Sequence, residues 1–116
     1  WPTNVRRIEL SVTVDYKSDM EKVIELLKRA IEEEPLVVKD GSVENTVVFN
    51  SFNSNGITYN VMFWTERATY FDSLNALTIR IKKIFDENGI VIPYNMLDVR
   101  IWNRYDAEGN VGNEKN

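Results

Sequence analysis

The sequence contains no cysteine and no histidine among its 116 residues. The absence of cysteine excludes disulfides, thiolate metal sites and thiol nucleophiles, and the absence of histidine excludes imidazole ligands and triads with a histidine base. The side chains left for chemistry are carboxylates, lysines, tyrosines and hydroxyls. We therefore expect no catalysis, no bound metal and no cofactor.

Basic residues are fewer than acidic ones, because 14 Lys and Arg stand against 18 Asp and Glu, for a formal net charge of −4. An acidic chain attracts phosphates poorly, so we expect no nucleic-acid partner. The hydrophobic share of 43% suits a globular domain, and the length suits a single one. The first methionine is Met20, and we expect the chain to be a piece of a longer protein.

Charge is missing altogether from residues 46–65, a stretch of transmembrane length. It contains four asparagines, however, whose amides are costly in hydrocarbon. At its centre, Asn55-Gly56 is a turn signal that favours positive φ. We interpret the stretch as a β-hairpin with strands at 43–52 and 57–65 and a loop at 53–56.

Periodicity predicts the remaining elements. Residues 5–15 alternate as a half-buried strand, and residues 97–102 form a last strand. Ser18 and Glu21 form a capping box that begins a helix ending near residue 34, before Pro35. A second helix is capped by Thr69 and ends at Gly89. Its apolar stripe consists of Phe71, Leu74, Leu77, Thr78, Ile81, Ile84 and Phe85.

The element order is therefore β-α-β-β-α-β, an α+β fold. With right-handed crossovers it predicts a ferredoxin-like sandwich, in which two helices cover one face of an antiparallel four-stranded sheet and the other face is open. We expect a single domain over residues 5–103 and a polar, flexible tail over residues 104–116.

Three segments carry family signals. Residues 12–19 read Val-Thr-Val-Asp-Tyr-Lys-Ser-Asp, residues 34–37 read Glu-Pro-Leu-Val, and residues 85–94 read Phe-Asp-Glu-Asn-Gly-Ile-Val-Ile-Pro-Tyr. In this order they resemble the entry to the first helix, its exit and the end of the second helix in the C-terminal α/β domain of small-conductance mechanosensitive channels, the MscS family.

The resemblance implies a cytoplasmic piece of a membrane channel that releases solutes on osmotic downshock. Such a piece supplies assembly and filtering of a vestibule and no catalysis. The implied partners are identical subunits in a ring, a heptamer in the full-length channel, together with the transmembrane and β domains of the parent. The implied location is the cytoplasmic side of a bacterial or archaeal inner membrane.

The open sheet face carries the first candidate interface. Strand alternation places Met62, Trp64 and Trp102 on it. We expect Ser11 and Thr13 to separate the two tryptophan-bearing strands with small side chains, leaving a shallow apolar floor. An apolar floor of this kind marks an interface rather than scattered surface hydrophobes.

Pro93 and Tyr94 form the second candidate interface, as a family contact point between subunits. The alternative is that Pro93 only ends the backbone bonding of residues 90–92. Both interpretations stay open at this stage.

Two acidic groups have alternative interpretations. Asp15 and Asp19 suit either acid/base chemistry or the positive end of a helix dipole, and we favour the dipole. The three glutamates at 32–34 either line a vestibule or form a solvated helix end, and we favour the solvated end.

Other functions on this topology fit less well. An RNA-recognition module needs a basic residue and ordered aromatics, and only Gly56 and Tyr59 match. An acylphosphatase-like enzyme needs an anion-binding loop, whereas residues 15–19 are acidic and lack glycine. The remaining alternative is a small-molecule regulatory or protein-interaction module.

Overall fold

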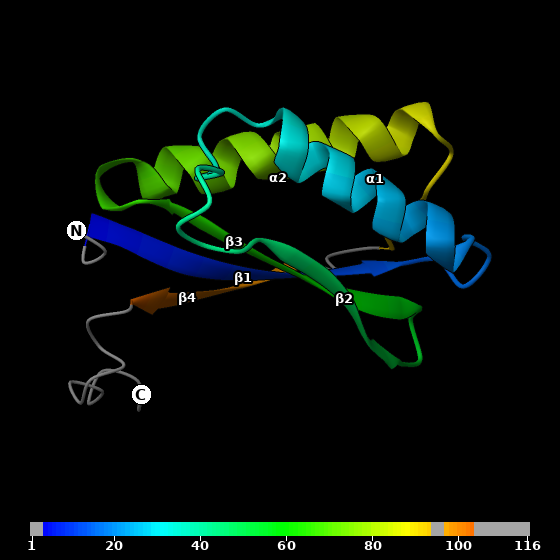
Figure 1. Ribbon diagram of the computed structural model, residues 1–116. Coiled ribbons are helices and arrows are strands. Elements are labelled where there is room, and N and C mark those ends of the chain that lie inside the picture. The colour runs from blue at the N-terminus through cyan, green and yellow to red at the C-terminus, as the bar shows by residue number, and fades with distance from the viewer. Residues whose placement is uncertain (1–3, 94–96, 104–116) are drawn as a thin grey trace.

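Two helices cover one face of an antiparallel sheet in the computed structural model (Figure 1), which describes residues 4–93 and the backbone of residues 97–103. The α+β prediction is confirmed. The elements are β1 (Val5–Val14), α1 (Met20–Glu33), β2 (Thr46–Phe52), β3 (Ile57–Glu66), the 3₁₀ helix η2 (Arg67–Thr69), α2 (Tyr70–Glu87) and β4 (Leu97–Asn103).

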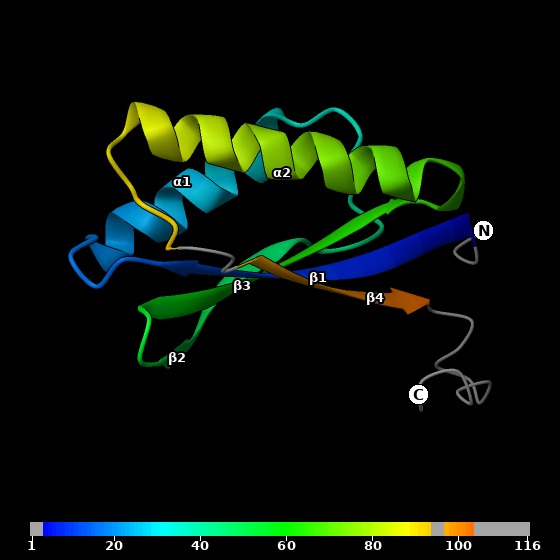
Figure 2. The ribbon, with the colours of Figure 1, turned by 180° about the vertical axis from the view of Figure 1, so that it is seen from behind.

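The strands run in the order β2-β3-β1-β4, and each neighbouring pair is antiparallel. The two opposite views show α1 on the β2 side and α2 on the β4 side of the same sheet face (Figures 1 and 2). Within the part of the chain that the structure describes, no helix is long and apolar enough to cross a membrane.

The core lies between the helices and the sheet, as the alternation predicts. On β1 the side chains of Ile8, Leu10, Val12 and Val14 are buried, and on β3 those of Tyr59, Val61 and Phe63. They pack against buried side chains of both helices, which are Val23, Leu26, Leu27, Ala30, Ile31, Leu77, Ile81, Ile84 and Phe85. Phe71 is an exception to the predicted α2 stripe: it is 68% exposed and stacks on Tyr70, so its assignment to the core is wrong.

The first helix starts one residue later than the capping box predicts. Asp19, and not Ser18, is the N-cap residue, and its carboxylate accepts a hydrogen bond from the Glu21 N–H at 3.1 Å. The Ser18 N–H instead donates to the Asp15 carbonyl, which keeps Ser18 in the preceding turn. Both side chains are competent caps, and the turn decides between them.

The second helix ends as predicted and begins differently. Gly89 has a φ of +72°, and the Ile90 N–H donates to the Phe85 carbonyl at 2.9 Å, which is a Schellman ending. At the start, Thr69 occupies the N-cap position, but its hydroxyl makes no capping bond. The chain enters α2 through the 3₁₀ turn η2, which replaces a side-chain cap.

The predicted hairpin is present, but two details differ. The first strand begins at Thr46 rather than at residue 43, and its pairing with β3 shifts between Phe49 and Ser51, which is a β-bulge. Gly56 is not among the glycines with positive φ. It is required because a side chain there would overlap the carbonyl oxygen of Val14 on β1.

Candidate functional site

The predicted interface residues of β3 lie on the open face of the sheet. Met62 and Trp64 are half-buried, and they alternate with the buried Val61 and Phe63. In the register of the sheet, Trp64 lies opposite Arg7 of β1, and Arg7 lies opposite Trp102 of β4. Arg7, and not Ser11 or Thr13, therefore separates the two tryptophan positions, so that part of the prediction is wrong.

The rest of the open face is a polar network. The Asn60 amide donates to the Glu9 carboxylate at 2.9 Å, and the Asn60 carbonyl accepts from Ser11 at 3.1 Å and from Asn50 at 3.2 Å. Two more hydroxyls, those of Thr13 and Thr58, are 2.7 Å apart. The face is thus charged at Arg7 and Glu9 and hydrogen-bonded beyond them, and the predicted apolar floor is wrong. The error arose because alternation identifies a face but not which residues lie side by side.

The other candidate contact residues are only partly within the described chain. Pro93 is half-buried, and the segment before it is fixed to the sheet because the Asp15 N–H donates to the Val91 carbonyl at 3.0 Å. Tyr94, the side chain of Trp102 and the predicted tail at 104–116 lie outside the described residues.

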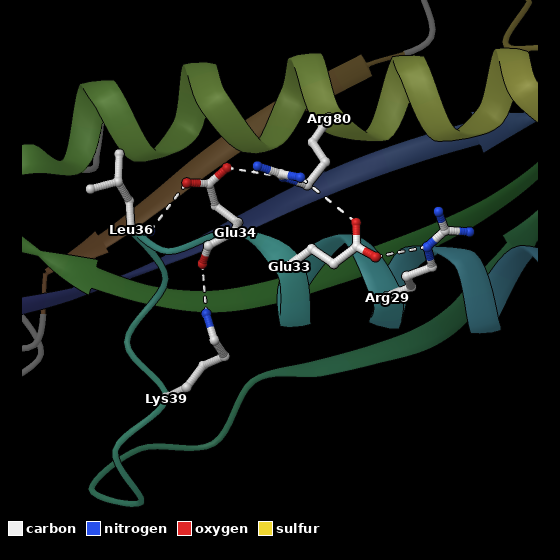
Figure 3. Close-up of polar contacts among 6 residues, drawn as sticks. All are labelled: Arg29, Glu33, Glu34, Leu36, Lys39 and Arg80. Atoms are coloured by element: carbon white, nitrogen blue, oxygen red, sulfur yellow. Dashed lines mark hydrogen bonds and ion pairs between the residues drawn. The ribbon is translucent and has the colours of Figure 1, made fainter.

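A buried acidic side chain joins the two helices. Glu34, directly after α1, is only 3% exposed, and its carboxylate accepts from the Arg80 Nε of α2 at 3.2 Å and from the Leu36 N–H at 3.1 Å (Figure 3). The predicted solvated helix end therefore holds for Glu32 and Glu33, which are exposed, but is wrong for Glu34. Pro35 turns the chain here, and Arg80 offers the compensating charge that a buried carboxylate needs.

This cluster extends to both sides of Glu34. Arg80 also lies 3.7 Å from Glu33, which pairs with Arg29 at 3.0 Å, and the Lys39 ammonium donates to the Glu34 carbonyl at 2.6 Å (Figure 3). A cation at the C-terminal carbonyls of α1 complements the helix dipole. The cluster joins α1, α2 and the loop that follows α1. Because the carboxylates of Glu33 and Glu34 are each paired with an arginine, they do not form a free pair for acid/base chemistry.

Two groups in the described chain have shifted acidity. Hydrogen bonds from the side chain and the backbone of Ser42 lower the pKa of Asp40, which is fully exposed in the turn at 40–42. Burial raises the pKa of Tyr59, and the charge of Asp19 raises it further. The described residues contain no cluster of three or more acidic side chains that could hold a metal.

The arrangement defines a class of protein: an α+β domain in which two helices cover one face of an antiparallel sheet and leave the other face open. Comparison with known proteins agrees. The family model described as "Mechanosensitive ion channel MscS, C-terminal" matches residues 8–92. The chain therefore belongs to the MscS family and represents the C-terminal domain of a mechanosensitive channel.

Individual relatives support the same assignment. An MscS family protein of Buchnera aphidicola (subsp. Schizaphis graminum) is 33% identical over 103 residues, which cover 85% of this chain and 34% of the relative. The small-conductance mechanosensitive channel of Helicobacter pylori is 31% identical over 103 residues, which cover 88% of this chain and 37% of the relative. The crystal structure of Helicobacter pylori MscS in the closed state superposes with a TM-score of 0.73 at 31% identity, over 89% of this chain and 40% of that one.

The chain spans about a third of the length of the curated relatives it matches. These relatives therefore contain large regions with no counterpart in this sequence.

Proposed function

We propose that this domain forms part of the cytoplasmic vestibule of a mechanosensitive channel that releases solutes on osmotic downshock. In this proposal identical subunits assemble in a ring, a heptamer in the full-length protein, on the cytoplasmic side of the inner membrane. The domain contributes assembly and carries no catalysis. The observation that carries the proposal is the likeness to Helicobacter pylori MscS over 89% of the chain.

We also assign the domain to the ferredoxin-like fold, over residues 5–103. The strand order β2-β3-β1-β4 and the placement of both helices on one face support this assignment. A polar, flexible tail over residues 104–116 remains a proposal from composition alone.

The open-face row at Trp64, Arg7 and Trp102 is proposed as the contact with the preceding domain of the parent protein, with Met62 beside it. The row lies near Val5, where the chain enters β1, so a preceding domain would sit next to it. Pro93 and Tyr94 are proposed as a contact between subunits.

A chimera tests the function. The segment of Helicobacter pylori MscS that corresponds to residues 5–103 is replaced by those residues of this chain, and the chimera is expressed in a bacterial strain that lacks its own mechanosensitive channels. We expect the chimera to migrate as an oligomer of the same size as the parent channel in native mass spectrometry. We also expect it to raise survival after osmotic downshock at least about tenfold.

Two controls sharpen the result. A channel truncated before the exchanged segment shows what the domain contributes, and Trp64→Ser in the chimera tests the open-face row. A chimera that folds and inserts in the membrane yet stays monomeric and does not restore survival contradicts the proposal. Full assembly of the Trp64→Ser chimera contradicts only the role of the row.

A further inference from the structure

Two phenylalanines lie exposed at the outer edge of the sheet. Phe49 and Phe52 are 40% and 61% exposed, and their ring centroids are 4.9 Å apart. Phe49 also makes an edge contact with the buried ring of Tyr59 at 6.4 Å. The apolar interior thus continues from Tyr59 to the surface of the edge strand β2.

The bulge in β2 creates this aromatic pair. Residues three apart in a regular strand face opposite sides of the sheet. Here Phe49 pairs with Tyr59 and Phe52 with Ile57, and both of those partners face the helices. The extra residue, Asn50, therefore brings both phenylalanines to the same side. Bulges re-aim side chains in this way at edges and functional sites.

The strand and the loop that carry the pair contain no charged residue. Thr46–Phe52 carries neither a charged residue nor proline, and the loop at 53–56 is also uncharged. Edge strands that must stay single usually carry such residues. Tyr16, 50% exposed, adds another ring at this end, because its hydroxyl donates to the Asn53 carbonyl. We call Tyr16, Phe49 and Phe52 the edge patch.

The edge patch lies far from both connections of the domain to the rest of the chain. Val5 pairs with Glu66 at one end of the sheet, and Arg6 pairs with Asn103, so the chain enters β1 and leaves β4 at that same end. The patch lies at the other end, where Val14 pairs with Ile57 (Figure 1). The ten residues of β1 separate the two ends by about 30 Å.

We propose that the edge patch docks onto a neighbouring copy of this chain. This proposal rests on the ring assembly proposed above and identifies one of its contact surfaces. A domain that precedes β1 in the same chain attaches about 30 Å away, which favours a second copy as the occupant. Since the bulge interrupts the ladder, the contact is made by side chains and not by strand addition.

The size of the patch predicts a weak contact for the isolated chain. The three side chains expose roughly 300 Å² per copy, from their exposed fractions and the area of aromatic side chains. A contact of about 600 Å² in total lies below the roughly 1,200–2,000 Å² of stable interfaces. The patch therefore needs the other contacts of a ring, and an experiment on the chain must detect weak association.

The test uses amide NMR spectra of the 116-residue chain between micromolar and millimolar concentration. We expect the amide signals of residues 46–57 and of Tyr16 to shift with concentration in the wild-type chain. Phe52→Ser removes the most exposed ring of the patch and should abolish those shifts, weakening association at least about tenfold. The matched control is Phe71→Ser, which removes a 68% exposed ring of α2 outside the patch and should leave the shifts unchanged.

Three results overturn the proposal. One is wild-type signals that do not move up to millimolar concentration. Another is Phe52→Ser associating like the wild type. The third is a difference in the amide signals of the patch between the full chain and a chain cut after residue 103, if that difference is the same at every concentration. The chain's own tail would then be the occupant of the patch. Phe52→Ser in the chimera separates the two proposals. Normal assembly of that variant refutes the edge patch but not the channel function. Concentration-dependent association of the isolated chain, together with a chimera that has no channel activity, refutes the channel function but not the edge patch.

Discussion

Removing the Arg80 guanidinium should destabilise the domain far more than removing a cation elsewhere on the same helix. Arg80 is the only side-chain cation that the structure places on the Glu34 carboxylate among the described residues. In Arg80→Met, Glu34 keeps only the Leu36 N–H. Hydrogen bonds to charged groups contribute about 1.5–3 kcal/mol, and a buried charge left without its partner costs about 3–5 kcal/mol. Because the Arg80 side chain is 34% exposed, we expect about 2–3 kcal/mol.

The assay is urea denaturation followed by circular dichroism, with thermal melting beside it. A loss of about 2 kcal/mol corresponds to a fall in Tm on the order of 10 °C for a domain of this size. The matched control is Lys82→Met, which breaks the exposed Lys82–Asp86 pair of 2.8 Å on the same helix. Exposed pairs of this kind contribute about 0.5 kcal/mol or less, so the control should melt nearly like the wild type.

A double-mutant cycle with Glu34→Gln separates the pair from the helix. The glutamine removes the charge and keeps an acceptor for the Leu36 N–H, so Arg80→Met should cost at least about 1 kcal/mol less in the Glu34→Gln background. Additive effects of the two substitutions, or an Arg80→Met variant that melts like Lys82→Met, would refute the reasoning. Glu34 would then be tolerated as a buried carboxylate for another reason.

Three further predictions concern single positions. Gly56→Ala should cost about 2–3 kcal/mol in urea denaturation, because its methyl group would overlap the Val14 carbonyl. Tyr59→Phe should change stability by less than about 1 kcal/mol, since the described residues offer its buried hydroxyl no hydrogen-bond partner. Ser42→Ala should raise the pKa of Asp40 towards its ordinary value in a carboxyl NMR titration. Because the folded-state pKa of Asp40 is lowered, its contribution to stability is present above the unfolded-state pKa and is lost as the pH falls through the folded-state pKa. The substitution should reduce that acid dependence and leave the part due to the Ser42 backbone N–H.

The sequence predicts the faces of the central strands because a single period governs them. Ile8, Leu10 and Phe63 are buried as alternation requires, since they lie on the sheet face that the two helices cover. The end of α2 is also predictable from the sequence, because Gly89 supplies the positive φ that the Schellman ending needs. In both cases the signal is local.

The features that the sequence did not reveal depend on pairs of distant residues. Glu34 is paired with Arg80, 46 positions further along the chain, and nothing in a run of glutamates shows which one is buried. The register that puts Arg7 beside Trp64 depends on how β3 returns along β1 after a helix and a hairpin. The β2 bulge is a property of two strands together. The only sequence feature that pointed to the bulge was an uncharged strand with two aromatic residues, Phe49 and Phe52, three positions apart.

The contact proposed at the Trp64 row and the contact proposed at the edge patch lie at opposite ends of the sheet, and this separation matters for how a ring could form. A contact at the Trp64 row joins the domain to its own chain and fixes its orientation. A contact at the edge patch then joins it to the next subunit, and a surface that meets a different surface on its neighbour repeats around a closed ring. Each contact alone is small, but ring closure makes the second one intramolecular and raises its effective concentration. Weak association of the isolated chain is therefore the expected companion of stable assembly in the parent protein.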